Sequence, residues 1–180
     1  MLILGVNAYH GDSSACVVNG GKLVAAAEEE RFIRIKHWAG FPEKSIDYCL
    51  KEVGCGLADV EHVAINTDPN AHLFKKAAYA VHNRFSPRMI MARLKNRRQR
   101  LTINDELDKA FPSEDIRAQI HYIEHHLSHI ASAHLLSPFE NSMAVSIDGF
   151  GDFSSAAWGP CHGAELNIEG RVLYPHSMGI

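Results

Sequence analysis

The chain has 180 residues, of which 46% are hydrophobic and 22% are charged, and its net charge is −3. These values are typical of globular domains and argue against a disordered chain. No apolar run approaches the roughly 20 residues that span a bilayer, and the first residues lack the basic start of a secretory signal, so we expect a cytoplasmic protein without a membrane partner.

The first 28 residues predict a strand and a hairpin. Residues 2–7 form a short apolar run that ends in a polar loop, residues 8–13. Residues 14–18 and 22–28 are two further apolar runs, joined by Asn19-Gly20-Gly21. Asn-Gly between two such runs predicts a hairpin, because both central residues tolerate a positive φ.

A helix and a buried strand are expected next. The helix should begin at Pro42 and end at Gly54, because its apolar positions repeat at helical spacing: Ile46, Cys49, Leu50 and Val53. Residues 60–66 read as a buried strand, and residues 70–110 as a largely helical, less regular section. Within that section, seven Lys or Arg residues and no acidic residue lie between Arg84 and Arg100. We interpret this basic run as a solvated helix face rather than a nucleic-acid site, because no aromatic residue is interleaved between Met89 and Arg100.

The strand pattern then starts again. Residues 120–123 predict a strand and residues 125–136 a helix, which Ser137-Pro138 should end. Apolar residues 142–147, a loop at 148–152 and apolar residues 154–158 follow, with a further pair around Asn167 and Gly170. This restart resembles the two-lobed actin, sugar-kinase and Hsp70 fold, an α/β fold in which each lobe is ribonuclease-H-like.

The expected domains follow from that pattern. Residues 1–138 should form the first ribonuclease-H-like lobe, with a variable basic helical section at about 70–115. Residues 139–180 should form the beginning of a second lobe that is truncated, so we expect the remaining C-terminal part of the same protein as a partner. The isolated piece should be inactive.

The candidate metal site lies in a histidine-rich segment. Five of the twelve histidines fall between His121 and His134. His125 and His129 are four residues apart, so on a helix their side chains share one face and can converge on one metal. His126 and His129 form the competing pair at a spacing of three. Asp148, at a strand end, could complete a set of nitrogen and oxygen ligands suited to iron, zinc or manganese.

Three blocks of sequence resemble the carbamoyltransferases of the NodU/CmcH type. Residues 9–16, Tyr-His-Gly-Asp-Ser-Ser-Ala-Cys, resemble the family's His-Asp-Ser-Ser-Ala stretch but insert Gly11. Residues 27–37 with Phe41-Pro42 resemble its EERF-x-R-x-KH…FP signature. The third block comprises His-His-Leu-Ser-His at residues 125–129 and Asp-Gly-Phe-Gly-Asp at residues 148–152.

The resemblance implies an O-carbamoyltransferase whose amino-terminal domain is like that of the tRNA threonylcarbamoyl-transfer enzymes. In such relatives ATP and carbamoyl phosphate give a carbamoyl-adenylate, and the carbamoyl group passes to a hydroxyl of a sugar or other small acceptor. By position, His125, His129 and Asp148 match the family's metal ligands, with a further Asp expected beyond residue 180. The metal should be a divalent transition metal, iron first, with zinc or manganese as alternatives, and a homodimer is an open alternative.

The resemblance also assigns roles to the N-terminal loops. His10 and Asp12 match residues near the transfer centre, and Lys36 and His37 match a segment close to acceptor and adenylate. We expect catalytic roles for His10, Asp12 and Lys36. His10 could remove the acceptor's proton, and Lys36 could hold a phosphate as a point charge. Cofactor binding is expected of Ser13, His37, Gly149 and Gly151. The loop that contains the two glycines lets backbone N–H groups approach phosphate.

Simpler interpretations stay open for several of these residues. His10 could cap a strand end, and Lys36 could be solvated. Glu28, Glu29 and Glu30 are interpreted as surface charges or partners for nearby arginines. Two other functions also remain: carbamoyl transfer to tRNA, and a non-catalytic lobe that binds nucleotide or phosphate. The basic run would suit tRNA, but the EERF…KH block argues against it.

Overall fold

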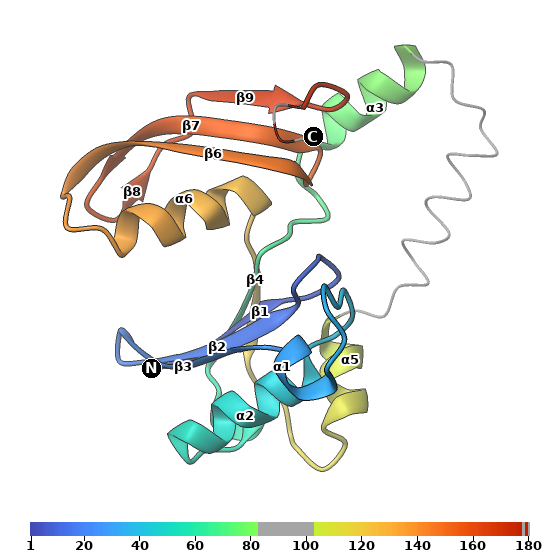
Figure 1. Cartoon of the computed structure of the whole chain (residues 1–180), viewed down its shortest axis with the longest axis vertical. Helices are drawn as coiled ribbons and strands as arrows, with labels where there is room; N and C mark the ends of the chain where they lie inside the picture. Colours follow the sequence, from blue (N-terminus) through green and yellow to red (C-terminus); the bar gives the residue numbers. More distant parts are fainter. Residues whose placement is uncertain (83–102, 178, 180) are drawn as a thin grey trace. The chain divides into compact units, whose positions relative to one another are not determined.

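Two β-sheets organise the chain, and each lies in its own compact unit (Figure 1). The computed structural model describes residues 1–82, 103–177 and 179, so the basic run at 84–100 lies outside the described residues. The first unit contains Met1–Ile65 and the described part of Phe85–His121. The second contains the described parts of Asn66–Arg84 and Tyr122–Ile180.

The first unit is built on a five-stranded sheet with the order β3-β2-β1-β4-β5. Its strands are β1 (Leu2–Asn7), β2 (Ser14–Asn19), β3 (Lys22–Glu28), β4 (His62–Ile65) and β5 (Gln119–Tyr122). The first three strands pair antiparallel, and β4 joins β1 in parallel. This order and these directions are those of a ribonuclease-H-like lobe, which confirms the predicted fold class.

Helix α2 (Glu43–Val53) packs against β2 and β3 and ends at Gly54, whose φ is 75°. The predicted helix is therefore confirmed, and its apolar side joins the core with Leu4, Val17 and Val63. The unit also contains α1 (Glu30–Ile33), the 3-10 helix η1 (Leu57–Asp59) and α5 (Ile103–Ala110). Leu107 of α5 is fully buried in the same core.

The carboxylate of Glu29 holds the first turn of α2. It accepts hydrogen bonds from the backbone N–H of Lys44 (3.2 Å) and from both the N–H and the hydroxyl of Ser45 (2.8 Å each). The first N–H groups of a helix have no partner within the helix, so this carboxylate acts as their cap. The expectation that Glu29 is a surface charge is therefore wrong: the residue is 3% exposed.

The second unit contains a smaller antiparallel sheet and two helices. The elements are α3 (Leu73–His82), α6 (His125–Leu135), β6 (Asn141–Gly151), β7 (Ser154–His162), β8 (Glu165–Leu166) and β9 (Gly170–Leu173). Helix α6 lies along one face of β6 and β7 (Figure 1). Ile130 of α6 packs there with Ala144, Ala157 and Cys161. Among the described residues, no helix has the length and apolar character needed to cross a bilayer.

The structure differs from expectation at three points. The turn between β2 and β3 is Gly20-Gly21, with φ of 56° and 80°, because Asn19 still pairs with Lys22. Residues 148–151, expected as loop, continue β6 with an irregular register. The compact units also differ from the expected lobes 1–138 and 139–180, because α6 packs on the sheet of the second unit.

Candidate metal centre

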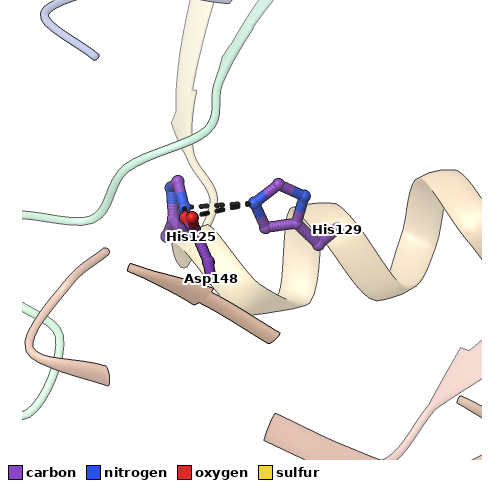
Figure 2. A group of neighbouring side chains, drawn as sticks. All are labelled: His125, His129 and Asp148. Atoms are coloured by element: carbon purple, nitrogen blue, oxygen red, sulfur yellow. Dashed lines mark hydrogen bonds and ion pairs between the residues drawn. The ribbon is translucent and has the colours of Figure 1, made fainter. Parts of the chain in front are cut away.

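Three side chains of the second unit converge on one point (Figure 2). His125 is the first residue of α6, His129 lies one turn later on the same helix, and Asp148 lies in β6. The His125 Nε2 atom is 2.7 Å from Asp148 Oδ2 and 3.1 Å from His129 Nε2. His129 Nε2 is 3.7 Å from Asp148 Oδ2. The predicted pair at a spacing of four thus meets the predicted carboxylate.

The His125 ring is fixed by its surroundings. Its Nδ1 lies 3.3 Å from the backbone carbonyl of Asn66. A carbonyl only accepts, so Nδ1 carries the proton of this contact and Nε2 is directed at Asp148 and His129. Gly151 provides the space for the ring, because a Cβ there would lie 1.9 Å from His125 Cδ2.

The chemistry of these atoms fits a divalent metal. With Nδ1 protonated, a neutral His125 would place the Nε2 lone pair 2.7 Å from a carboxylate oxygen, a contact that needs a proton or a cation between the two atoms. Ligand atoms bound to one metal at 2.0–2.2 Å lie about 2.8–3.6 Å apart, close to the separations here. Two imidazoles and a carboxylate suit iron, zinc or manganese.

The ionisation of His129 and Asp148, the two half-exposed residues of the cluster, also favours binding of a metal. Burial by itself raises the pKa of Asp148, but hydrogen bonds from His125 and the Gly149 N–H hold that pKa below its ordinary value. Burial, followed by the charge on His125, lowers the pKa of His129. The groups are therefore biased toward carboxylate and neutral imidazole, which are the forms that bind metals.

The other buried histidines of α6 have structural contacts. His126 Nδ1 lies 2.8 Å from the Ser146 hydroxyl on β6. His134 contacts the Ser142 hydroxyl (2.8 Å) and the carbonyl of Gly163 (3.0 Å). These two histidines face the sheet with Ile130, whereas His125 and His129 meet Asp148. In the described part of the chain, the structure thus groups His125, rather than His126, with His129 and Asp148.

The N-terminal site residues lie in the first unit, in two loops that hydrogen-bond to each other. His37 Nδ1 is 2.9 Å from Asp12 Oδ1, and both residues have a positive φ. The Ser13 hydroxyl is buried and donates to the carbonyl of Gly40 (2.8 Å). Lys36 is exposed, and His10 is partly exposed. The structure therefore brings Asp12 and His37 together and gives Ser13 a role in joining the loops.

Both glycines that were expected to bind a cofactor contact residues of the candidate metal centre. The N–H of Gly149 donates to Asp148 Oδ1 (2.6 Å), and Gly151 faces the His125 ring. Binding of phosphate by this segment remains a prediction.

Sequence reasoning missed Asn66 and Asp152. The carbonyl of Asn66 contacts His125 Nδ1, and the Asp152 carboxylate accepts a hydrogen bond from the His125 N–H (2.9 Å). A backbone carbonyl leaves no signal in residue identity. Asp152 could have been found from the sequence, because it is the last residue of the Asp-Gly-Phe-Gly-Asp block at residues 148–152.

The chain thus combines a ribonuclease-H-like unit with a second unit that carries a histidine and aspartate cluster, which defines an α/β protein with a candidate metal centre. The family described as "Carbamoyltransferase N-terminus" matches residues 2–180, and the chain belongs to this family. The predicted resemblance is therefore confirmed.

Two relatives show how far the likeness extends. The chain is 33% identical to the uncharacterized protein sll1178 of Synechocystis over 99% of its own length and 30% of the relative's. It is 33% identical to the nodulation protein NolNO of Sinorhizobium fredii over 97% of its own length and 25% of the relative's. The chain thus spans about a quarter to a third of the curated relatives it matches. YeaZ from Pseudomonas aeruginosa, a solved structure, aligns with a TM-score of 0.46 and 14% identity over 99% of this chain and 70% of that one.

Proposed function

We propose that the complete protein is a metal-dependent O-carbamoyltransferase. Carbamoyl phosphate and ATP would give a carbamoyl-adenylate with release of phosphate and pyrophosphate. The hydroxyl of a sugar or other small acceptor would then take the carbamoyl group with release of AMP. The observation that supports this most directly is the convergence of His125, His129 and Asp148 in a member of the carbamoyltransferase family.

His125, His129 and Asp148 would hold the metal, which when bound would polarise a carbonyl or neutralise phosphate charge. His129 and Asp148 are half-exposed, so one side of the group is open to a substrate. The hydrogen bonds of His125 and Asp148 to the backbone of Asn66 and Gly149 would keep these ligands in place before substrate binds.

The polar residues of the first unit would serve proton transfer and charge binding. The imidazole of His10 would accept the proton of the acceptor hydroxyl, since histidine is the side chain that most often serves as a general base in enzymes. Asp12 would orient His37 through their hydrogen bond. The exposed ammonium of Lys36 would attract the phosphate of the donor.

Metal content tests the proposed centre directly. In the complete protein, elemental analysis should find about one transition metal per chain. His129→Ala and Asp148→Asn should each lose most of it. His162→Ala is a matched control, because His162 is an exposed histidine of the same unit whose ring contacts the Asn141 side chain and not the histidine and aspartate cluster. Wild-type protein without metal, or full metal content in both ligand variants, would overturn this centre.

Activity tests the reaction. The complete protein should release pyrophosphate from ATP when carbamoyl phosphate is present. It should transfer labelled carbamoyl to a hydroxyl acceptor drawn from a panel of sugars, with release of AMP. The metal-depleted enzyme should lose transfer and regain it when iron, zinc or manganese is restored. Transfer that persists at the full rate after depletion would separate the reaction from the metal.

A further inference from the structure

We propose that Asp152 is a positioning residue for the metal centre, because its carboxylate anchors both structures that orient His125. This inference rests on the proposed metal binding by His125, His129 and Asp148. It concerns a residue that has no place among those ligands: in the described part of the chain, the group of potential ligand atoms does not include Asp152.

The Asp152 carboxylate accepts three hydrogen bonds. Its Oδ1 accepts from the Thr67 hydroxyl (2.8 Å), and its Oδ2 accepts from the backbone N–H of Asp68 (2.7 Å) and of His125 (2.9 Å). Because the N–H of His125 lies in the first turn of α6, a carboxylate at this position is also favoured by the helix dipole. One side chain thus joins the start of α6 to residues 67–68.

The same anchor sets the direction of the His125 ring. Asn66 directly precedes Thr67, and its carbonyl contacts His125 Nδ1. The ring is therefore held at the backbone by Asp152 and at Nδ1 by a carbonyl that Asp152 keeps in place. Such contacts select the tautomer whose Nε2 is available as a ligand.

The local backbone gives an independent indication. Asp152 and Phe153 are the central residues of the turn between β6 and β7, with φ of 48° and 74°, and Gly151 pairs with Ser154 across it. Turns of this kind favour Asn and Gly, so Asp-Phe needs compensation from its surroundings. The three hydrogen bonds of Asp152 supply it, as do the contacts of the Phe153 ring with Tyr79 and Tyr174.

The test is metal affinity in the complete protein, measured by competition with a chelator. Asp152→Ala should weaken binding by about 10- to 100-fold. Asp152→Asn should weaken it less, because the amide oxygen still accepts hydrogen bonds. Thr67→Val removes one of the three hydrogen bonds with little change of shape and should give a small loss in the same direction.

Two controls separate positioning from charge and from stability. Asp68→Asn removes one negative charge from the same segment but keeps the backbone N–H that Asp152 accepts, so its affinity should be unchanged. Ser146→Ala removes the hydroxyl on β6 that contacts His126 of α6. This variant should have a lower melting temperature but an unchanged affinity for metal. Equal losses in either control would overturn the inference.

A spectroscopic readout completes the test. The visible spectrum of the Co²⁺-loaded protein should change in Asp152→Ala and in Thr67→Val, because His125 would be reoriented, and should stay constant in both controls. Wild-type protein that binds no metal would refute the proposed function. Wild-type protein that binds metal, together with Asp152 variants of unchanged affinity and spectrum, would refute only the role of Asp152.

Discussion

His10 and Lys36 lie in polar loops of the first unit, and we predict that they act in chemistry rather than in folding. Replacing either by Ala in the complete enzyme should change stability by less than about 0.5 kcal/mol, as is usual for exposed side chains. Transfer should fall about 100-fold or more in His10→Ala if this residue is the base. Lys36→Ala should mainly weaken binding of the phosphate-bearing donor.

Steady-state kinetics and thermal melting of each variant check this prediction. Lys22→Ala, which removes another exposed lysine of the first unit, is a suitable control for Lys36→Ala. Near-normal turnover in His10→Ala would show that the hydroxyl proton leaves by another route.

Cys49 provides a prediction about pH. Burial, and then the proximity of Cys16, raise the pKa of the Cys49 thiol to about 11. The folded protein therefore holds this proton more tightly than the unfolded chain, in which the pKa of cysteine is about 8.5. The resulting stability is fully present below that pH and is lost as the pH rises toward 11. The free energy of unfolding, measured with urea from pH 8 to pH 11, should decline less with pH in Cys49→Ala than in the wild-type protein.

Alkylation gives a second measurement of the same property. At pH 8 the native Cys49 thiol should resist iodoacetamide, whereas the unfolded chain should react. Rapid reaction in the native state would show that the thiol is accessible or ionised, contrary to its burial.

At the scale of elements, the Glu29 cap of α2 carries a clear expectation. Glu29→Ala should destabilise the protein by about 2 kcal/mol, because the N–H groups of Lys44 and Ser45 lose a charged acceptor in a buried place. Denaturant unfolding measures the change. The neighbouring Glu28→Ala should cost no more than about 0.5 kcal/mol, since the contact of the Glu28 carboxylate with Arg31 is a surface ion pair. Similar losses of stability in both variants would contradict the role of Glu29 as the cap of α2.

The elements themselves were largely predictable from sequence. Helical spacing and the stop at Gly54 located α2, and the two Gly residues after Asn19 located the hairpin. In α6, spacing placed His125 and His129 on one face but did not show which face meets a carboxylate. The orientation of the helix depends on Ser142 and Ser146 of β6. Their hydroxyl groups hydrogen-bond to His134 and His126, so these two histidines face the sheet. Contacts between segments far apart in sequence, such as Glu29 with Ser45 or Asn66 with His125, leave no periodic pattern.

At the scale of the whole molecule, one face of strand β6 is apolar and exposed. Met143, Val145 and Ile147 of β6 are 63%, 59% and 54% exposed. In β1, which like β6 begins an antiparallel hairpin, the alternate residues Leu2, Leu4 and Val6 are instead part of the core. An exposed strand face of this kind favours association.

We therefore predict that the 180-residue chain, produced alone, self-associates at micromolar concentrations. Val145→Lys should shift light scattering toward monomer, because a charge would then have to be desolvated at the contact. Phe74→Lys is the matched control, because Phe74 is a 93% exposed apolar residue that lies on α3 and not on β6. A wild-type chain that is already monomeric would contradict this prediction.

The second unit draws on two separate stretches of sequence, Asn66–Arg84 and Tyr122–Ile180. The polypeptide that supplies His125, His129 and Asp148 therefore does not supply Asn66 or Thr67, on which the histidine ring and Asp152 depend. A shortened protein that begins at Tyr122 would keep every proposed ligand and lose their support. Adding a peptide of residues 66–82 in trans should then restore metal affinity to such a protein, so this unit could be split and reassembled by complementation.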